Sequence, residues 1–317
     1  MNISLDEICS FLKTRNNFYI LTHQYPDGDT LGSANALCRA LQKTGKNARV
    51  LCSDKIPKKY SILSRGIKKQ EFEADYIISV DVADTQLLGE NLLKYSDKID
   101  LCIDHHESNK AFAKMQYIEG SSAATAEIIY ELINLLGVKI DKQIAVCIYT
   151  GITTDTGGFK YANATPRSYR ISADMLEKGI DACSINRIMF DTKSRSRLEI
   201  ERQVLDTMEF FYESRCAVIH VTREMIKKAK ANESDIEGLA SIPRQVEGVL
   251  VGVTLREQKD GVFKVSVRTE EDISAAAICE NFGGGGHQGA AGCNLPYDLD
   301  VAKKKIVDAV GFAFKGK

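Results

Sequence analysis

The sequence predicts an α/β protein: a doubly wound, mainly parallel sheet in an N-terminal domain, followed by a smaller α/β domain. Two observations predict this class. Short β-branched runs recur at 17–23, 47–53, 75–81 and 98–106, and each of them precedes a loop. Segments with apolar residues at helical spacing accompany them, at 31–45, 122–137 and 141–155. Strands that alternate with helices are typical of parallel, doubly wound sheets.

The domain boundaries follow from a change of character along the chain. A chain of 317 residues has room for two domains. Residues 1–188 carry the alternating pattern, and we expect them to form the catalytic, metal-binding domain. Residues 189–214 are charged and helical in pattern, which predicts a helical connector. Strand-like runs at 216–222, 246–257 and 261–270, with a helix before the glycines at 283–286, predict a substrate-binding domain over 215–317.

Composition excludes several classes of protein. A net charge of −1 gives no general attraction to nucleic acid or to an anionic membrane, so an anionic ligand must be held locally. No apolar stretch is long enough to span a bilayer, and the N-terminus lacks the form of a signal peptide. The nine cysteines contain no C-x-x-C pair and favour a reducing compartment. We therefore expect a cytoplasmic protein without a membrane partner.

Polar side chains follow the predicted strands at the point where each strand ends. Ligands of open α/β sheets collect at the carboxyl ends of the strands, so these side chains are expected to converge. One carboxylate in such a place is commonly a helix cap, but several together repel unless a cation neutralises them. Mixed imidazole and carboxylate ligands suit manganese, iron, cobalt or zinc more than calcium. The residues concerned are His23, Asp27 and Asp29, then Asp81, then Asp104, His105 and His106, and finally Asp155.

The loop after the first strand reads "HQYPDGDTLGSA". We expect the next helix to begin close behind it, near Gly32 and Ser33. Gly28 separates the two aspartates, and the sequence gives no reason for this spacer to matter.

The motifs that carry these residues resemble those of a known family. They are "HQYPDGD" at 23–29, "SVDVAD" at 79–84, "DHH" at 104–106, "GITTDTGGF" at 151–159 and "GGGGHQGAAG" at 283–292. In this order they resemble the DHH phosphoesterase family with its DHH-associated C-terminal domain. The stretches 242–257 and 263–270 are most similar to its NrnA branch, whose members degrade very short RNAs and dephosphorylate 3′-phosphoadenosine 5′-phosphate (pAp).

The resemblance implies two divalent metal ions, with Mn²⁺ expected and Co²⁺ or Mg²⁺ as alternatives. It assigns His23 and Asp27 to the first metal, and Asp29, His105 and Asp155 to the second, with Asp81 as the bridge between them. It also implies that Asp104 orients a neighbouring imidazole and that His106 faces the substrate phosphate. The residues implied in the catalytic step are therefore His106, Asp104 and Asp81.

Substrate binding is expected in the second domain. Backbone N–H groups of Gly284, Gly285 and Gly286 can approach a phosphate closely, and we expect a following helix to add positive potential. The resemblance adds His287 and Arg268 as substrate contacts. The alternatives are a glycine helix cap and a solvated strand arginine. Arg256, Lys193 and Arg195 are weaker candidates.

The function implied is metal-dependent cleavage of oligonucleotides of about two to five residues to 5′-mononucleotides, with pAp as a possible second substrate. One alternative is a dedicated hydrolase of dinucleotides such as pApA or of cyclic di-AMP. Another is an inactive nucleotide sensor, but a sensor predicts a degraded ligand set and every position is intact. Relatives commonly form homodimers, so a homodimer is also expected.

Overall fold

The computed structural model describes residues 1–236, 238–258, 260–270 and 273–315. The chain forms two compact units, Met1–Thr192 and Lys193–Lys317. Of the predicted connector at 189–214, the residues from Lys193 onward belong to the second unit. Within the described ranges, no helix has the length and apolar character needed to cross a membrane.

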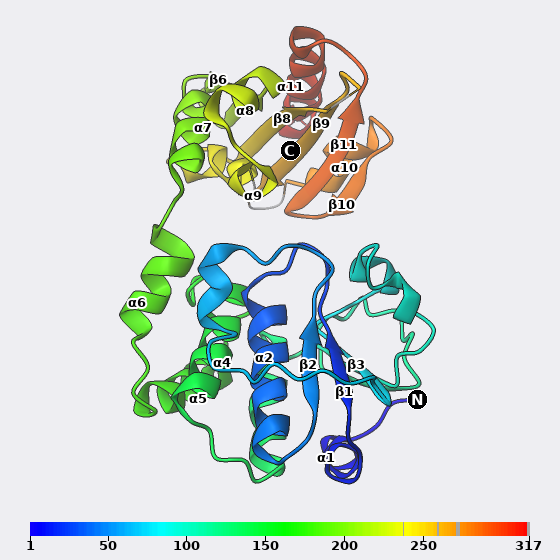
Figure 1. Cartoon of the computed structure of the whole chain (residues 1–317). Coiled ribbons are helices and arrows are strands. Elements are labelled where there is room, and N and C mark those ends of the chain that lie inside the picture. Colours follow the sequence, from blue (N-terminus) through cyan, green and yellow to red (C-terminus); the bar gives the residue numbers. More distant parts are fainter. Residues whose placement is uncertain (237, 259, 271–272, 316–317) are drawn as a thin grey trace. The chain divides into compact units, whose positions relative to one another are not determined.

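The first unit is built on a parallel sheet of five strands (Figure 1). The strands are β1 Phe18–Leu21, β2 Ala48–Leu51, β3 Tyr76–Val80, β4 Leu101–Asp104 and β5 Met115–Ile118, in the order β2-β1-β3-β4-β5. This confirms the predicted doubly wound sheet. Since β2 lies on one side of β1 and β3 on the other, the strand order reverses at β1. A ligand site is expected beyond the carboxyl ends of β1 and β3.

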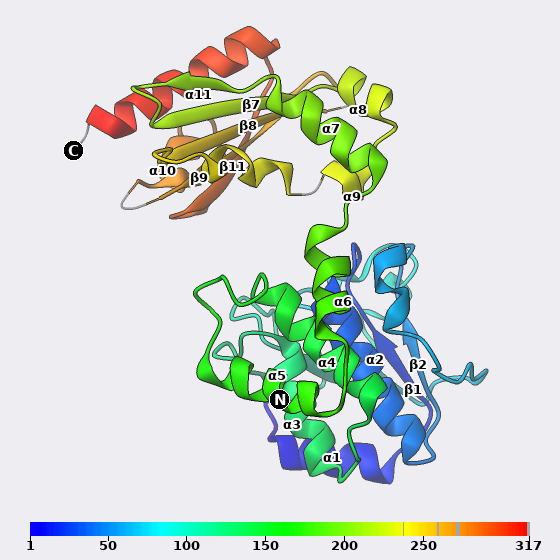
Figure 2. The ribbon, with the colours of Figure 1, turned by 90° about the vertical axis from the view of Figure 1, so that its left-hand side faces the viewer.

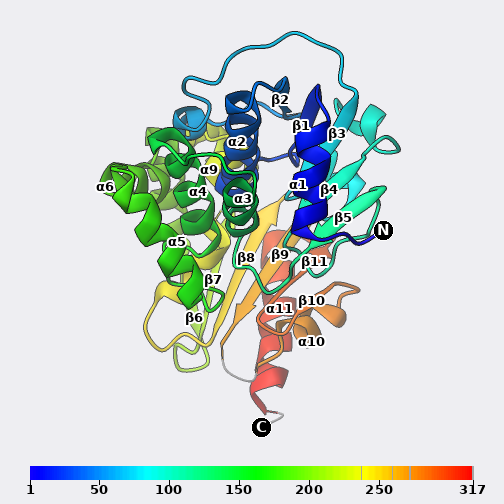
Figure 3. The same ribbon diagram turned by 90° about the horizontal axis from the view of Figure 1, so that it is seen from below.

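Helices cover one face of this sheet. They are α1 Leu5–Thr14, α2 Gly28–Lys43, α3 Thr125–Leu135, α4 Lys142–Asp155, α5 Pro166–Glu177 and the short α6 Ala182–Asn186, which continues into a π-helical turn at Arg187–Asp191. Figure 3 shows α2, α3 and α4 gathered on one side of the strands. Their buried side chains, such as Leu37 and Ile148, pack against Phe18 and Ile20 of β1.

The opposite face carries shorter elements. The 3₁₀ helices Thr85–Leu88 and Leu93–Tyr95 pack Leu88 and Leu92 against Ile77 and Cys102 of the sheet. In residues 1–192, all of which are described, the β1–β2 connection is the one crossover between strands that contains an α-helix. The helix predicted at 31–45 is the one in this crossover, and the helices predicted at 122–137 and 141–155 follow β5.

The loop after β1 leads directly into α2. Asp27 caps this helix, because its Oδ1 accepts the N–H groups of Asp29 and Thr30 at 3.0 Å each. The helix begins at Gly28, four residues earlier than the sequence predicts. Asp29 therefore lies in the first turn of α2.

Gly28 and Gly32 allow α2 to approach α4 closely (Figure 2). A Cβ atom at Gly28 would lie 2.3 Å from Oγ1 of Thr154, and one at Gly32 would lie 2.5 Å from the carbonyl oxygen of Cys147. The expectation that the Gly28 spacer is neutral is therefore wrong. The close approach brings the start of α2 next to the end of α4, where Asp155 lies.

Replacing Gly28 by alanine should lower the free energy of unfolding by roughly 1–3 kcal/mol, because the methyl group overfills the contact between α2 and α4. Chemical denaturation of the two proteins measures the difference. In the double variant Gly28→Ala/Thr154→Ala, two of the three closest atoms of Thr154 are gone, so part of the loss should return. A Gly28→Ala protein as stable as the parent would contradict this account of the contact.

The second unit contains a six-stranded sheet in the order β10-β11-β9-β8-β7-β6. The strands are β6 Glu209–Phe211, β7 Cys216–Val221, β8 Val251–Glu257, β9 Phe263–Thr269, β10 Gly285–His287 and β11 Ala290–Leu295. β7 and β8 are parallel, and the other neighbours are antiparallel. This confirms the smaller α/β domain.

Helices cover both faces of the second sheet. α10 Ala275–Glu280 and α11 Leu299–Lys315 pack on one face, and α7 Arg195–Leu205, α8 Arg223–Ala229 and α9 Glu233–Ile236 pack on the other. Side chains of β7 alternate between the two cores: Val218 lies with α10 and α11, and Ile219 lies with α7.

Candidate functional site

The predicted ligands of the first unit meet at the carboxyl edge of its sheet. The end of β1 and the start of α2 deliver three of them, the ends of β3 and β4 deliver the next, and the last residue of α4 completes the set. Their donor atoms form three groups, and within each group all the atoms lie within 4.8 Å of one another. The groups are His23, Asp27 and Asp81; Asp29, His105 and Asp155; and Asp81, His105 and His106.

Asp81 belongs to two of these groups and lies beside both His23 and His105. Its Oδ2 is 3.7 Å from Nε2 of His23, and its Oδ1 is 3.7 Å from Nε2 of His105. The side chain is 2% exposed, and Thr125 donates to its Oδ1 at 2.8 Å. The backbone of Asp81 has φ +61°, an unfavourable conformation for a residue other than glycine. Asp81 thus presents one oxygen to each histidine.

Asp29 and His105 are held in fixed orientations by the chain that leads into α3. The carboxylate of Asp29 is buried and accepts the N–H groups of Thr125 at 2.7 Å and Ala126 at 3.0 Å. His105 Nδ1 lies 3.0 Å from the carbonyl oxygen of Ser122. A carbonyl can only accept, so Nδ1 carries a proton, and Nε2 is the nitrogen turned toward the cluster. That Nε2 is 3.2 Å from Asp155 Oδ2.

Asp104 and His106 form a separate pair beside the cluster. Oδ1 of Asp104 lies 2.7 Å from Nδ1 of His106, and Oδ2 accepts from Asn109 at 2.7 Å. Burial opposes ionisation of Asp104, but the hydrogen bonds from His106 and Asn109 outweigh it and lower its pKa. The His106 side chain is 42% exposed, so the ring is held from one side and open on the other.

The cluster carries more negative charge than its surroundings compensate. Burial, then the charges of Asp27 and Asp155, raise the pKa of Asp81 to about 8. Burial and the charges of Asp81 and Asp155 also raise the pKa of Asp29 well above its usual value. Burial opposes protonation of His23 and His105, yet the neighbouring aspartates raise their pKa values to about 9 and about 10. Bound protons thus supply positive charge that divalent cations would otherwise supply, so these residues suit such ions.

The metal-free protein should therefore lose stability as the pH rises from 6 to 9. Asp81 has a folded pKa of about 8, above its unfolded value of 3.8, so its contribution is fully present below pH 3.8 and is lost as the pH rises through 8. The contribution of His23 is lost in the same direction, between pH 6.5 and 9. Thermal unfolding with EDTA measures the fall in Tm, and saturating Mn²⁺ should flatten it. A metal-free Tm that stays constant over this range would contradict the charge balance of the cluster.

The glycine run of the second unit forms one strand of a hairpin. Gly285 and Gly286 lie in β10 and pair with Gly292 and Ala291 of β11. The predicted helix after the glycines is therefore wrong, because β11 follows them. The described residues 283–295 thus lack the positive potential that was expected from the start of a helix. A Cβ atom at Gly284 would lie 2.3 Å from the carbonyl oxygen of Gly292, so the close approach of these strands requires glycine.

A cavity of about 300 Å³ lies beside this hairpin. Gly283, Gly284 and Gly285 line it together with Lys264 of β9. Arg268 lies on the same strand as Lys264, four residues on, and its Nη1 donates to the carbonyl of Val267 at 3.0 Å. His287 is exposed at the end of β10. Lys264 is thus a cation at the glycine run.

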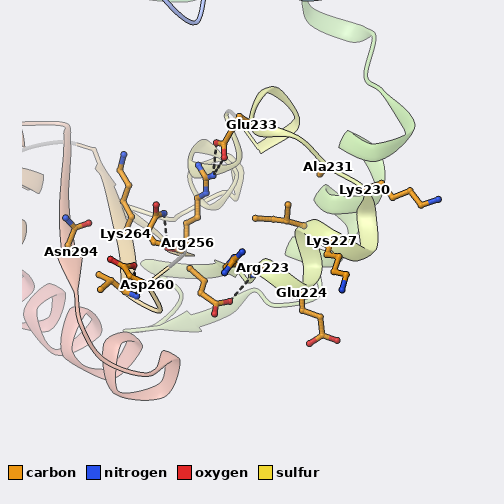
Figure 4. Close-up of a pocket in the computed structure, with 14 residues that line it drawn as sticks. Arg223, Glu224, Lys227, Lys230, Ala231, Glu233, Arg256, Asp260, Lys264 and Asn294 are labelled. Carbon is orange, nitrogen blue, oxygen red and sulfur yellow. Dashed lines mark hydrogen bonds and ion pairs between the residues drawn. The ribbon is translucent and has the colours of Figure 1, made fainter. Parts of the chain in front are cut away.

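A larger cavity, of about 1310 Å³, lies between α8 and the β8–β9 hairpin (Figure 4). Arg256 points at Glu233, whose two oxygens accept from its Nη2 at 2.7 Å each. Five cationic side chains and four acidic ones line this cavity, so its charge is nearly balanced. Arg256 is therefore engaged within the unit. Lys193 is likewise paired, with Glu201 at 2.8 Å.

Several residues of these sites are not predicted from the sequence. Ser122 and Thr125 contact the ligand cluster through a carbonyl, an N–H and a hydroxyl, and Asn109 holds Asp104. Small polar residues in loops give no sequence signal for such contacts. Lys264 is different, since the alternation in "FKVSVR" places it on the same face of β9 as Arg268.

Comparison with known proteins agrees with this architecture. Residues 17–152 match the DHH family, N-terminal domain, and residues 216–312 match the DHHA1 domain. The bifunctional oligoribonuclease and PAP phosphatase NrnA of Thermus thermophilus is 34% identical over 304 residues, which are 92% of this chain and 88% of that protein.

Solved structures also match. An exopolyphosphatase-related protein from Bacteroides fragilis has 28% identity and a TM-score of 0.84, over 97% of this chain and 95% of that one. RecJ of Thermus thermophilus in complex with Mn²⁺ has 16% identity and a TM-score of 0.56, over 98% of this chain and 55% of that one, so it shares the fold. With two matching domains in order and a relative similar over almost its whole length, the chain belongs to the DHH family of phosphoesterases.

Proposed function

We propose that the protein is a two-metal phosphodiesterase that degrades oligonucleotides of about two to five residues to 5′-mononucleotides, and that it also removes the 3′-phosphate of pAp. The observation that carries the proposal is the position of Asp81, with one oxygen toward His23 and the other toward His105. The similarity to a relative named as an oligoribonuclease and PAP phosphatase supports the choice of substrate.

The metal assignment follows two of the three groups of donor atoms. His23 and Asp27 would hold one ion, Asp29, His105 and Asp155 would hold the other, and Asp81 would bridge them. Imidazole and carboxylate ligands suit Mn²⁺, and RecJ, which has the same fold, is described in complex with that ion. When bound, two such ions neutralise phosphate charge and activate a water at neutral pH.

His106 serves the substrate in this proposal. Its Nδ1 is engaged by Asp104 at 2.7 Å, which leaves Nε2 for a phosphate oxygen or for the leaving group. Asp104 keeps that orientation and stabilises positive charge on the ring. The exposure of His106 makes it accessible to a phosphate from solvent.

The second unit would hold the rest of a short substrate. Lys264 and the glycine hairpin border a cavity of about 300 Å³; Arg268 lies farther along the strand of Lys264 and His287 ends β10, and neither lines this cavity. The net charge of −1 gives little support for binding a long duplex. Localisation in the cytoplasm and assembly into a homodimer stay predictions.

A substrate series tests the proposal. The protein is incubated with Mn²⁺ and 5′-labelled RNA of 2, 5 and 24 nucleotides, and separately with pAp and with linear pApA, with EDTA as the control. We expect rapid loss of the two short RNAs, slow loss of the long one and phosphate release from pAp. Turnover of pApA alone would replace the proposal by a dinucleotide hydrolase. No Mn²⁺-dependent turnover of any of them would contradict it.

A further inference from the structure

The segment 119–127 leads from the end of β5 into the first turn of α3, and it contacts three of the proposed metal ligands without itself supplying one. The carbonyl of Ser122 accepts from His105, the N–H of Thr125 donates to Asp29, and the hydroxyl of Thr125 donates to Asp81. The segment thus fixes which ring nitrogen of His105 is available and how both carboxylates are turned. Groups of this kind strongly affect the affinity of a site for metal.

Arg167, in the first turn of α5, holds this segment. Its Nη1 donates to Oγ of Ser122 at 2.9 Å and to Oε2 of Glu119 at 3.0 Å. Its Nη2 lies 2.7 Å from Oε1 of Glu131, and its Nε lies 3.8 Å from Oε2 of Glu127. One planar guanidinium therefore joins both ends of the segment to α3 and α5.

The charges around Arg167 show why a cation is needed there. Three carboxylates surround a single guanidinium, and the side chain of Glu127 is fully buried. Ser168 also donates to Glu127, so this carboxylate is held without being neutralised. Burial opposes the charge on Arg167, but the hydrogen bond to Glu119 and the three acids outweigh it and raise its pKa. Without the guanidinium, the acids would repel one another and the segment would shift.

We infer that Arg167 is a positioning residue of the metal centre: through Ser122 it holds the carbonyl that accepts from Nδ1 of His105, and so it keeps Nε2 of that ring turned toward the cluster. This inference rests on the proposed two-metal function. Arg167 touches neither the donor atoms nor a substrate, so its effect passes through Ser122, whose hydroxyl it contacts and whose carbonyl contacts His105.

The test compares Arg167→Lys and Ser122→Ala with the parent. Lysine keeps the charge but not the planar fork, and alanine removes the hydroxyl while the carbonyl remains. Arg170→Lys is the matched control, because Arg170 lies on the same helix and is exposed. Mn²⁺ affinity is measured by the EPR signal of the free ion. The hydrogen bond from Nδ1 of His105 to Ser122 is followed in metal-free protein by long-range ¹H–¹⁵N NMR, which the small number of histidines, five, makes tractable.

We expect Arg167→Lys and Ser122→Ala each to weaken Mn²⁺ binding about tenfold and to move the Nδ1 signal of His105 toward that of a ring without the Ser122 hydrogen bond. The double variant should lose little more Mn²⁺ affinity than the single variant with the larger loss, because the two residues act in series. Arg170→Lys should match the parent. Saturating Mn²⁺ should restore most of the turnover of both single variants.

Parent-like Mn²⁺ affinity and parent-like His105 signals in both single variants would overturn the inference. The inference would also be overturned if the variants lowered the metal-free Tm but left both the Mn²⁺ affinity and the His105 signals unchanged, since Arg167 would then be purely structural. Both readouts are made without RNA, so a parent that binds Mn²⁺ but leaves every nucleotide intact would refute the proposed substrate alone. If the parent bound no Mn²⁺, the two-metal proposal would fail, and the His105 signals would still decide the role of Arg167.

Discussion

Replacing Asp81 by asparagine should lower Mn²⁺-dependent hydrolysis by a factor of at least about 10³, the largest effect we expect from any single substitution. The amide retains one oxygen for one group of ligands and presents an NH₂ to the other, so the bridge is lost. Initial rates on a dinucleotide at saturating Mn²⁺ measure the effect.

The loss should not come from unfolding. Burial and neighbouring acids raise the pKa of Asp81 to about 8, so near neutral pH the metal-free protein already holds a neutral carboxyl group that asparagine matches in shape. The metal-free Tm at pH 7 should therefore stay close to that of the parent. Asp84→Asn is the matched control, because Asp84 caps a 3₁₀ helix by accepting from the N–H of Gln86 at 2.9 Å. The Asp84→Asn protein should keep the activity of the parent. An Asp81→Asn protein with the full rate would show that the bridge is dispensable.

Replacing His106 by alanine should lower kcat about 10²- to 10³-fold, because a donor to the phosphate or leaving group is removed. Mn²⁺ affinity should stay within about twofold, since Nδ1 of His106 is engaged by Asp104 and the proposed assignment fills both metal sites without His106. Steady-state kinetics and the Mn²⁺ titration separate the two quantities.

Steady-state kinetics of further variants separate the proposed roles of the two units. His287→Ala should act mainly on KM, because His287 is assigned to substrate binding in the second unit. Asp104→Asn should lower kcat in the same direction as His106→Ala, since the amide can present NH₂ to Nδ1 and favour the wrong tautomer. If His106→Ala weakened Mn²⁺ binding strongly while kcat at saturation stayed unchanged, His106 would be a metal ligand instead.

Much of the ligand cluster follows from the sequence because of one rule of topology. Carboxyl ends of parallel strands meet at one edge of a sheet, so polar residues after β1, β3 and β4 come together whatever the details of their loops. The alternation of strands with apolar helical segments was sufficient to predict that sheet. The sequence does not show that Asp81 turns its two oxygens toward different histidines, because this depends on its backbone at φ +61°.

The parts that could not be predicted depend on contacts between distant residues. Gly28 matters because Thr154 packs against it, and no local pattern indicates that pair. A glycine run after a helix is compatible with a cap, a loop or a strand, and the pairing of Gly285 with Gly292 decides for a strand. Arg167 looks like an ordinary residue of an exposed helix until its contact with Ser122 is seen.

The central claim is that Asp81 joins two metal ions in the first unit, and a Mn²⁺ titration followed by EPR tests it most directly. We expect two ions per chain and, at saturation, the signal of a spin-coupled pair, because Asp81 would hold both ions. In Asp81→Asn the coupled signal should disappear. A single isolated Mn²⁺ per chain in the parent, or a coupled signal that survives in Asp81→Asn, would contradict the account.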